Sequence, residues 1–380
     1  MQRPDPSRIA SRRALRFSAG IVQYPFPATK KKPAYPVGPL LRAYLTRYAR
    51  EVPLPVSYTR LLDFAEAAPV IDADGNDTLW QSVIYRPHEQ LTLMKDLTYV
   101  YAILKAAGNR GLVEHLYVDR IDYCTFGNSN PFRVRIVNSH NHNQDYFYVK
   151  QADASRVYGL ELEHLLSPFR LHYFTNNTTL IEEHIIGLPG DVFVSRWLHD
   201  PSIKTIRLAK ELVKFNERCF VRLLGDMRAY NFVVDITPDV EEAQVRIRGM
   251  DFDQQSYSGR KNFYLPQFFK ENLPLVQHCL DHLDQTTANQ YKKEELSDLQ
   301  RRMADYRDRL GLLLDCMEDD TLSTPEKIEL LRVDLAEHWQ HKAFLKAESM
   351  GALVRLSLRN VGRVLAADRK DRSRLPFAYQ

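Results

Sequence analysis

Cysteine is scarce in this chain, and its arrangement suits neither a zinc site nor a disulfide framework. The 380 residues contain four cysteines, and no two of them form a C-x-x-C pair. Structural zinc sites usually use such closely spaced pairs, and small secreted domains use denser sets of cysteines. The sequence therefore argues against both classes and suits a reducing compartment, so we expect the protein to be cytoplasmic.

Long apolar runs and a strong net charge are also missing. No stretch is apolar and long enough to cross a bilayer, and the basic residues 1–17 lack the apolar centre of a secretory signal. The net charge is only +4, which is too small to require a nucleic-acid or membrane partner. We therefore expect no membrane span and no nucleic-acid partner. A chain of this length can form two lobes, each with its own core.

The most informative segment is residues 223–253. It places Asp226, Asn231 and Asp251 on or beside two strand-like runs, 232–236 and 245–250. The polar stretch between these runs predicts a hairpin, which would bring Asn231 and Asp251 together. Phosphoryl transfer needs such groups, because it asks the protein to position reactants and stabilise charge. Carboxylate and amide oxygens are also the ligands that magnesium prefers.

An ordered set of elements precedes this segment. The runs 113–126, 132–137 and 146–150 are typical of strands, and 156–166 reads as a helix. A further apolar run, 178–191, predicts a last strand followed by a hinge.

In this order, the motifs resemble the catalytic core of the protein-kinase-like fold, especially its aminoglycoside- and choline-kinase-type branch. Gly225-Asp226 is similar to that branch's catalytic loop, and Asp251-Phe252-Asp253 stands in the place of its metal-binding triplet. The chain departs from the family at Leu224, where a histidine is usual, and in a longer hairpin. The resemblance implies an α+β, two-lobed fold with a small antiparallel-sheet lobe, a larger helical lobe, and helical extensions at both ends.

The resemblance also implies roles around magnesium and the acceptor. Asp226 would be the catalytic base, and Arg228 would stabilise the transferring phosphate. The metal ligands would be Asn231 and Asp251, with Asp253 in support.

On the ATP side, the resemblance assigns Lys150 to the nucleotide phosphates, oriented by a glutamate of the following helix. The residues leave the choice between Glu161 and Glu163 open. The other implied nucleotide contacts come from a turn with a single glycine and from the backbone of the hinge: Gly127, Asn128, Ser129, Glu183 and Ile185.

The rest of the chain is arranged around this core. We expect a basic, proline-rich arm at 1–37, a helical extension at 38–112, a nucleotide-binding lobe at 113–186 and a helical lobe at 187–380. Within the extension, 39–52, 57–68 and 90–108 read as helices, and 203–224 predicts a long helix entering the catalytic loop. The extensions are also candidates for binding a protein partner.

The sequence therefore predicts an ATP- and magnesium-dependent phosphotransferase acting on a hydroxyl group, with a small-molecule acceptor favoured over a protein. Two alternatives remain open. One is a catalytically silent pseudokinase that binds nucleotide and acts as a scaffold, which the lost histidine and the glycine-poor loop favour. The other is transfer of a nucleotidyl group by the same residues.

Overall fold

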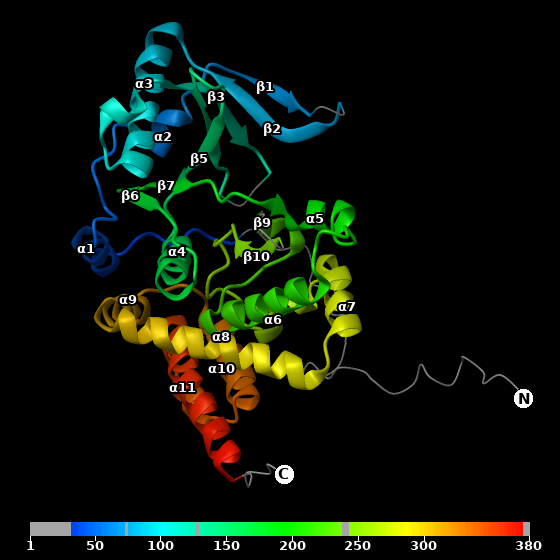
Figure 1. Cartoon of the computed structure of the whole chain (residues 1–380). Helices are drawn as coiled ribbons and strands as arrows, with labels where there is room; N and C mark the ends of the chain where they lie inside the picture. Colours follow the sequence, from blue (N-terminus) through cyan, green and yellow to red (C-terminus); the bar gives the residue numbers. More distant parts are fainter. Residues whose placement is uncertain (1–31, 73–74, 127–128, 238–242, 375–380) are drawn as a thin grey trace, which may run out of the picture.

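An antiparallel sheet forms the upper part of the molecule. The computed structural model describes residues 32–72, 75–126, 129–237 and 243–374. Seven strands pair in the order β1-β2-β3-β4-β5-β7-β6 (Figure 1). Their bounds are β1 Glu66–Ile71, β2 Asp77–Ile84, β3 Leu116–Cys124, β4 Phe132–Asn138, β5 Gln144–Gln151, β6 Tyr173–Asn176 and β7 Thr179–Glu183.

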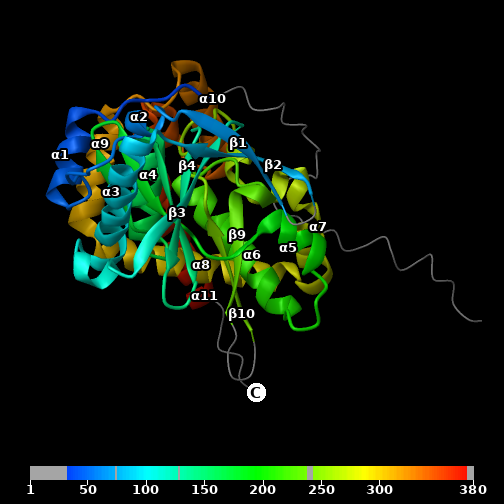
Figure 2. The same cartoon turned by 90° about the horizontal axis from the view of Figure 1, so that it is seen from above.

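The central strands alternate between buried and more exposed side chains, as expected where a sheet covers a core on one face. The burial of β4 follows this pattern at Phe132, Val134 and Ile136. Helix α3 (Pro87–Ala106) lies across that face (Figure 2). Its residues Leu93, Leu97, Val100 and Leu104 share one cluster with the strands. The strands predicted at 132–137 and 146–150 are confirmed.

The prediction for the N-terminal extension is partly wrong. Helix α1 (Pro39–Arg47) and α3 are present, but the helix expected at 57–68 is reduced to α2 (Tyr58–Leu61). The chain then forms the β1–β2 hairpin, which joins the sheet where Trp80 of β2 pairs with Cys124 of β3. The alanine-rich run favours helix locally, but Pro69 cannot continue a helix and the β-branched residues after it suit a strand. Tertiary pairing therefore overrides helix propensity here.

A second, smaller sheet and a group of helices form the lower part. Strand β9 (Phe232–Thr237) lies between β10 (Gln244–Gly249) and the short β8 (Leu188–Pro189), and Val234 of β9 pairs with Ile247 of β10. The predicted hairpin is therefore confirmed. The helices are α5 Gly190–Arg196, α6 Thr205–Arg222, α7 Leu273–His282, α8 Gln285–Asp305, α9 Arg307–Asp319, α10 Pro325–His338 and α11 Met350–Arg374. Within the described residues, none of the helices has the length and apolar character to cross a membrane.

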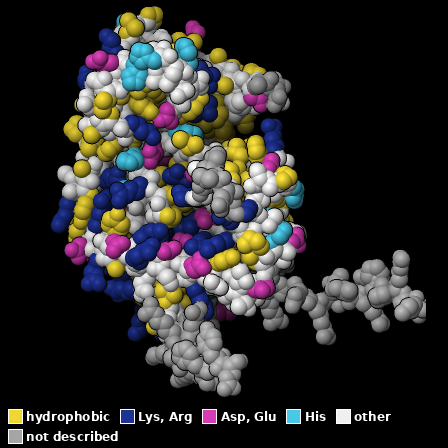
Figure 3. All heavy atoms as spheres, viewed as in Figure 1, with side chains coloured by type: hydrophobic (Ala, Val, Ile, Leu, Met, Phe, Trp, Pro, Cys, Tyr) yellow, Lys and Arg dark blue, Asp and Glu magenta, His cyan; other side chains and the backbone are white. Residues whose placement is uncertain are grey.

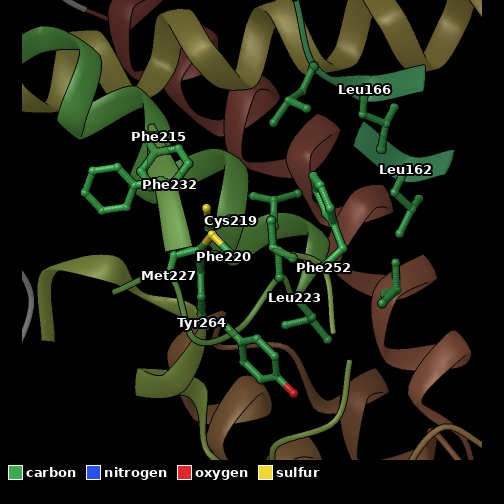
Figure 4. Packing of buried hydrophobic residues seen from close by; sticks show 14 of the residues in the cluster. Leu162, Leu166, Phe215, Cys219, Phe220, Leu223, Met227, Phe232, Phe252 and Tyr264 are labelled. Carbon is green, nitrogen blue, oxygen red and sulfur yellow. The ribbon is translucent and has the colours of Figure 1, made fainter. Parts of the chain in front are cut away.

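Helix α4 (Ala154–Leu166) lies between the two parts and is almost entirely buried. Asp153 caps its first turn, because its side chain accepts a hydrogen bond from the Arg156 N–H. Figure 4 shows Leu162 and Leu166 in the same apolar cluster as Phe220 and Phe252. The fit is close at Gly159, where an added Cβ would lie 2.9 Å from the Cβ of Phe252. The α4 backbone therefore packs directly on the segment that contains Asp251-Phe252-Asp253.

Candidate functional site

Three of the charged residues predicted to act together, Lys150, Asp251 and Asp253, lie around the first turn of α4. Figure 3 shows the surface hollowed between the sheet above and the helical part below. Lys150, at the end of β5, is buried, and its Nζ lies 2.7 Å from Oε2 of Glu182 on β7. Tyr148 pairs with Glu182 in the antiparallel register. Lys150 stands two residues beyond Tyr148, so both residues and Glu182 face the same side of the sheet.

Arg156 connects this pair to the Asp-Phe-Asp segment. Its side chain is only 2% exposed, and its guanidinium reaches three carboxylates. The distances are 3.1 Å to Glu182, 2.8 Å to Asp251 and 2.5 Å to Asp253. Five fixed N–H donors allow one guanidinium to serve several carboxylates at once. The result is a continuous chain of alternating charge from Lys150 through Glu182 and Arg156 to the two aspartates.

The two aspartates respond differently to this environment. Burial is the largest single influence on Asp253 and raises its pKa, but the charge and hydrogen bond of Arg156, together with the charges of Lys150 and Lys32, outweigh burial and hold that pKa below its ordinary value. Burial and the neighbouring charge of Asp253 instead raise the pKa of Asp251. Lys150 acts on both carboxyls, because its charge lowers each pKa. The predicted phosphate-binding lysine and the predicted metal-binding aspartates are therefore electrostatically coupled.

The predicted pairing of Lys150 with Glu161 or Glu163 is wrong. Both glutamates are on α4, but they lie further along the helix than Arg156 and bind other cations. Glu161 pairs with Arg50 and Arg309, and Glu163 lies 2.5 Å from Arg222. One helical turn or more separates them from Arg156, so they point to different neighbours.

Asp226 lies in the loop that follows α6, in an unusual backbone conformation. Its φ of +60° is left-handed, a region that few residues other than glycine adopt. Such conformations cluster at functional sites. Burial is the largest cause that raises the pKa of Asp226, to about 6, and the charge of Asp251 raises it further. Arg228 opposes this shift, because its Nε lies 2.8 Å from Oδ1 of Asp226.

Asn231 fixes the shape of this loop. Its Nδ2 donates to the backbone oxygen of Asp226 at 2.8 Å. Its own backbone oxygen accepts from the N–H of Met250 at 3.0 Å. The β9–β10 hairpin thus places Asn231 beside the residue that precedes Asp251, as the sequence predicts. Arg228 is anchored on its other side by Glu271, 3.1 Å away.

The remaining predicted contacts have mixed outcomes. Gly127 and Asn128 lie outside the described residues. Ser129 lines a small cavity of about 80 Å³ together with Asp253. Glu183 accepts hydrogen bonds from Lys105 and from the backbone of His172, and the Ile185 side chain is buried. The contact of the 183–185 backbone with adenine stays a prediction.

The predicted metal ligands have oxygen donors of the kind that magnesium prefers, but in this structure Arg156 binds the two carboxylates among them. Asp251, Asp253 and Asn231 offer carboxylate and amide oxygens, which are hard donors. Among the described residues, no group of three or more His, Cys, Asp or Glu side chains has the geometry to hold a metal ion. The predicted ligands are not such a group, because they consist of two carboxylates and the side-chain amide of Asn231. Arg156 competes with any metal for both carboxylates.

Sequence reasoning missed Arg156 and Glu182, which lie at the centre of the site. The sequence does offer a signal for Glu182, because this residue lies next to the predicted hinge and in the same predicted strand as Glu183. Its contact with Lys150 depends on the register between β5 and β7, which local pattern does not give. Arg156 lies in the first turn of a helix that also contains Glu161 and Glu163, the two residues to which the sequence assigned the pairing role. Its contacts with residues 95 and 97 positions away arise only in the folded chain.

No known protein family matches this chain, and no curated protein has significant sequence similarity to it.

Proposed function

We propose that this protein is an ATP- and magnesium-dependent phosphotransferase of protein-kinase-like fold. The observation that carries the proposal is the coupling of Lys150, Asp251, Asp253 and Asp226 around one site, although they come from β5 and from two separate loops. The order β3, β4, β5, α4, β6, β7, α6, loop and β9–β10 hairpin supports the same conclusion. It is the order that the resemblance implies for a nucleotide lobe followed by a catalytic lobe.

The roles follow from charge and position. Lys150 would contact the nucleotide phosphates, and its buried position beside Glu182 holds its side chain in place. Asn231, Asp251 and Asp253 would hold magnesium, which neutralises charge on the phosphates when bound. Arg156 would then have to give up part of its contact with the aspartates, because the cation and the guanidinium compete for the same oxygens.

Asp226 would orient the acceptor hydroxyl and take its proton. The acceptor oxygen forms a bond to the γ-phosphorus, the bond from that phosphorus to the bridging oxygen of ADP breaks, and ADP leaves. A pKa of about 6 leaves the Asp226 carboxyl ionised at neutral pH and close to the pH at which it must accept a proton. Arg228, held between Asp226 and Glu271, would stabilise charge on the transferring phosphoryl group.

One observation favours a second function, a nucleotide-binding pseudokinase that acts as a scaffold. Arg156 binds both aspartates at 2.8 Å or less. A site that keeps an internal cation on its metal ligands would bind nucleotide without magnesium and transfer nothing. This alternative and the phosphotransferase therefore differ in one measurable property, which is the dependence on magnesium.

The experiment is consumption of ATP labelled on the γ-phosphate, with pools of hydroxylated small molecules as acceptors. Comparison of wild type with Asp226→Asn tests the assigned base, and Asp235→Asn on β9 is the control. Loss of a general base typically lowers turnover by about 10²–10⁴-fold. We expect a loss of that order in Asp226→Asn and no change in Asp235→Asn. Equal activity in all three proteins would contradict the assignment of Asp226.

A further inference from the structure

The segment that precedes α1 is docked onto the candidate site. The backbone N–H of Tyr35 donates to Oδ2 of Asp153 at 2.8 Å, and the N–H of Ala154 donates to the backbone oxygen of Tyr35 at 2.8 Å. The segment thus pairs with the start of α4 and runs between the sheet and the helical part (Figure 1). Residues 32–37 of the expected arm are therefore held against the start of α4. Residues 1–31 lie outside the described residues.

Lys32 is a buried cation within this segment. Its side chain is 4% exposed, and its Nζ lies 3.0 Å from each carboxylate oxygen of Asp153. Its third contact is the backbone oxygen of Pro33 at 3.3 Å. The ammonium also lies 4.9 Å from the ring centre of Tyr35 and 5.6 Å from that of Tyr257. Burial of a lysine is costly, so its position calls for an explanation.

The small cavity beside Lys32 joins it to the candidate site. Its lining includes Ser129 of the predicted phosphate loop, Gln151 next to Lys150, and the metal-ligand candidate Asp253. Lys32 and Asp153 line the same cavity of about 80 Å³. The charge of Lys32 reaches Asp253, since it contributes to the lowered pKa of that carboxyl. Lys32 therefore lines the same cavity as Ser129, Gln151 and Asp253.

We propose that Lys32 contacts the terminal phosphates of the bound nucleotide, as a second cation beside Lys150; the inference rests on the proposed function. Residues 127–130, where the sequence predicts the phosphate-binding turn, contain a single glycine, so fewer backbone positions there are free to approach phosphate closely than in a glycine-rich loop. A lysine supplies a mobile point charge that binds phosphate without such a loop. A polyphosphate carries more negative charge than the single carboxylate of Asp153, so the ammonium is attracted towards it.

The test measures binding of ligands that differ only in phosphate content. Dissociation constants for adenosine, MgADP, MgATP and inorganic tripolyphosphate are measured by calorimetry for wild type, Lys32→Met and Lys32→Arg. Lys210→Met is the control, because Lys210 also pairs with a carboxylate, Glu294 at 2.8 Å, and lies over the ring of Tyr291. Lys210 is on α6 and its two partners are on α8. Thermal unfolding of each variant shows that the protein is folded.

Lys32→Met removes one charge-assisted contact with phosphate, so we expect it to weaken the binding of MgATP and tripolyphosphate by about 10-fold or more. Adenosine binding should stay within about twofold, since adenosine carries no phosphate, and Lys32→Arg should recover most of the loss. Lys210→Met should match wild type.

The outcomes separate the two proposals. If wild type binds MgATP and Lys32→Met binds it equally well, Lys32 does not contact phosphate and only the inference fails. Tighter binding in Lys32→Met would also overturn it, because the segment would then block the site. A uniform weakening that includes adenosine would show a structural role. If wild type binds none of the nucleotides, the proposed function itself fails.

Discussion

The two ends of α4 bury charge in different ways. At its C-terminal end, Glu161 and Glu163 each lie against arginines. The pKa of each is lowered because these cations and the hydrogen bonds to each carboxylate together outweigh the effect of burial. At its N-terminal end, one arginine faces three carboxylates, so negative charge is in excess. Asp251 is also 37% exposed there, whereas Glu161 is fully buried.

Under the proposed function, this difference separates structural ion pairs from the site that binds a ligand. The glutamate pairs at the C-terminal end are closed, because Tyr44 and Tyr173 complete the hydrogen bonds of Glu161 at 2.7 and 2.6 Å. At the N-terminal end Arg156 and Lys150 together face three carboxylates, so the negative charge there is only partly offset. Asp251, a partly exposed carboxyl with a raised pKa, is the kind of group that marks a candidate functional site.

The largest expected effect on stability comes from removing an ion pair at the C-terminal end of α4. Arg222→Met leaves the Glu163 carboxylate buried without its cation, 2.5 Å away in wild type. Removal of one partner of a buried pair typically costs about 3–5 kcal/mol. Chemical denaturation measures the change in the free energy of unfolding. A loss below about 1 kcal/mol would show that this end is not the tight pair described here.

The same end predicts a dependence of stability on pH. Because the folded-state pKa values of Glu161 and Glu163 lie below their unfolded values, their stabilisation is present above the unfolded pKa of about 4.3. It is lost as the pH falls through the folded pKa values. The double variant Glu161→Gln, Glu163→Gln should therefore lose stability relative to wild type at pH 7 and show a smaller difference at low pH. A constant difference across the range would contradict the lowered pKa values.

The N-terminal end of α4 should respond differently to the corresponding arginine-to-methionine substitution. Arg156→Met also removes a buried cation, but Asp251 is partly exposed, and magnesium can replace the guanidinium on the two aspartates. We expect a loss of stability that added magnesium partly restores, measured as the rise in melting temperature on titration. Arg222→Met should show no such rescue. Equal responses of the two variants to magnesium would remove the distinction between the ends of the helix.

The smallest expected effect concerns Asp226. Its folded pKa of about 6 lies above the unfolded value of about 3.9, so the folded state binds more protons between these values. Stability therefore falls as the pH rises from about 4 to about 6, and the full penalty remains above that range. Asp226→Asn removes the charge, so it should unfold at a higher temperature than wild type at pH 8. The difference should shrink at pH 5, and an unchanged or reversed difference would contradict the raised pKa.

Local pattern predicted the elements of this fold better than their contacts. Alternation and apolar periodicity located β4, β5, α4, α6 and the β9–β10 hairpin, since these signals depend on near neighbours in sequence. The β1–β2 hairpin escaped prediction, because its identity depends on pairing with β3.

The same limit applies to the candidate site. Spacing indicated Asp226, Asn231 and Asp251, because the hairpin that joins the last two is local. The partner of Lys150 was assigned to the wrong element, since the choice between a residue of α4 and Glu182 depends on strand register and on which residue of the helix faces the sheet. The contacts of Arg156 could be recognised only in the complete fold, because its partners come from β7 and from the segment after β10.

The most direct test of the proposed nucleotide site is to measure the melting temperatures of wild type and Asp251→Ala with ATP, in the presence and in the absence of magnesium. A ligand that binds only the folded state must raise the melting temperature. If the protein is a magnesium-dependent phosphotransferase, ATP should raise the melting temperature of wild type only when magnesium is present, and this rise should be lost in Asp251→Ala. A rise that is independent of magnesium would favour the scaffold, and no rise in wild type under either condition would contradict a nucleotide site at this position.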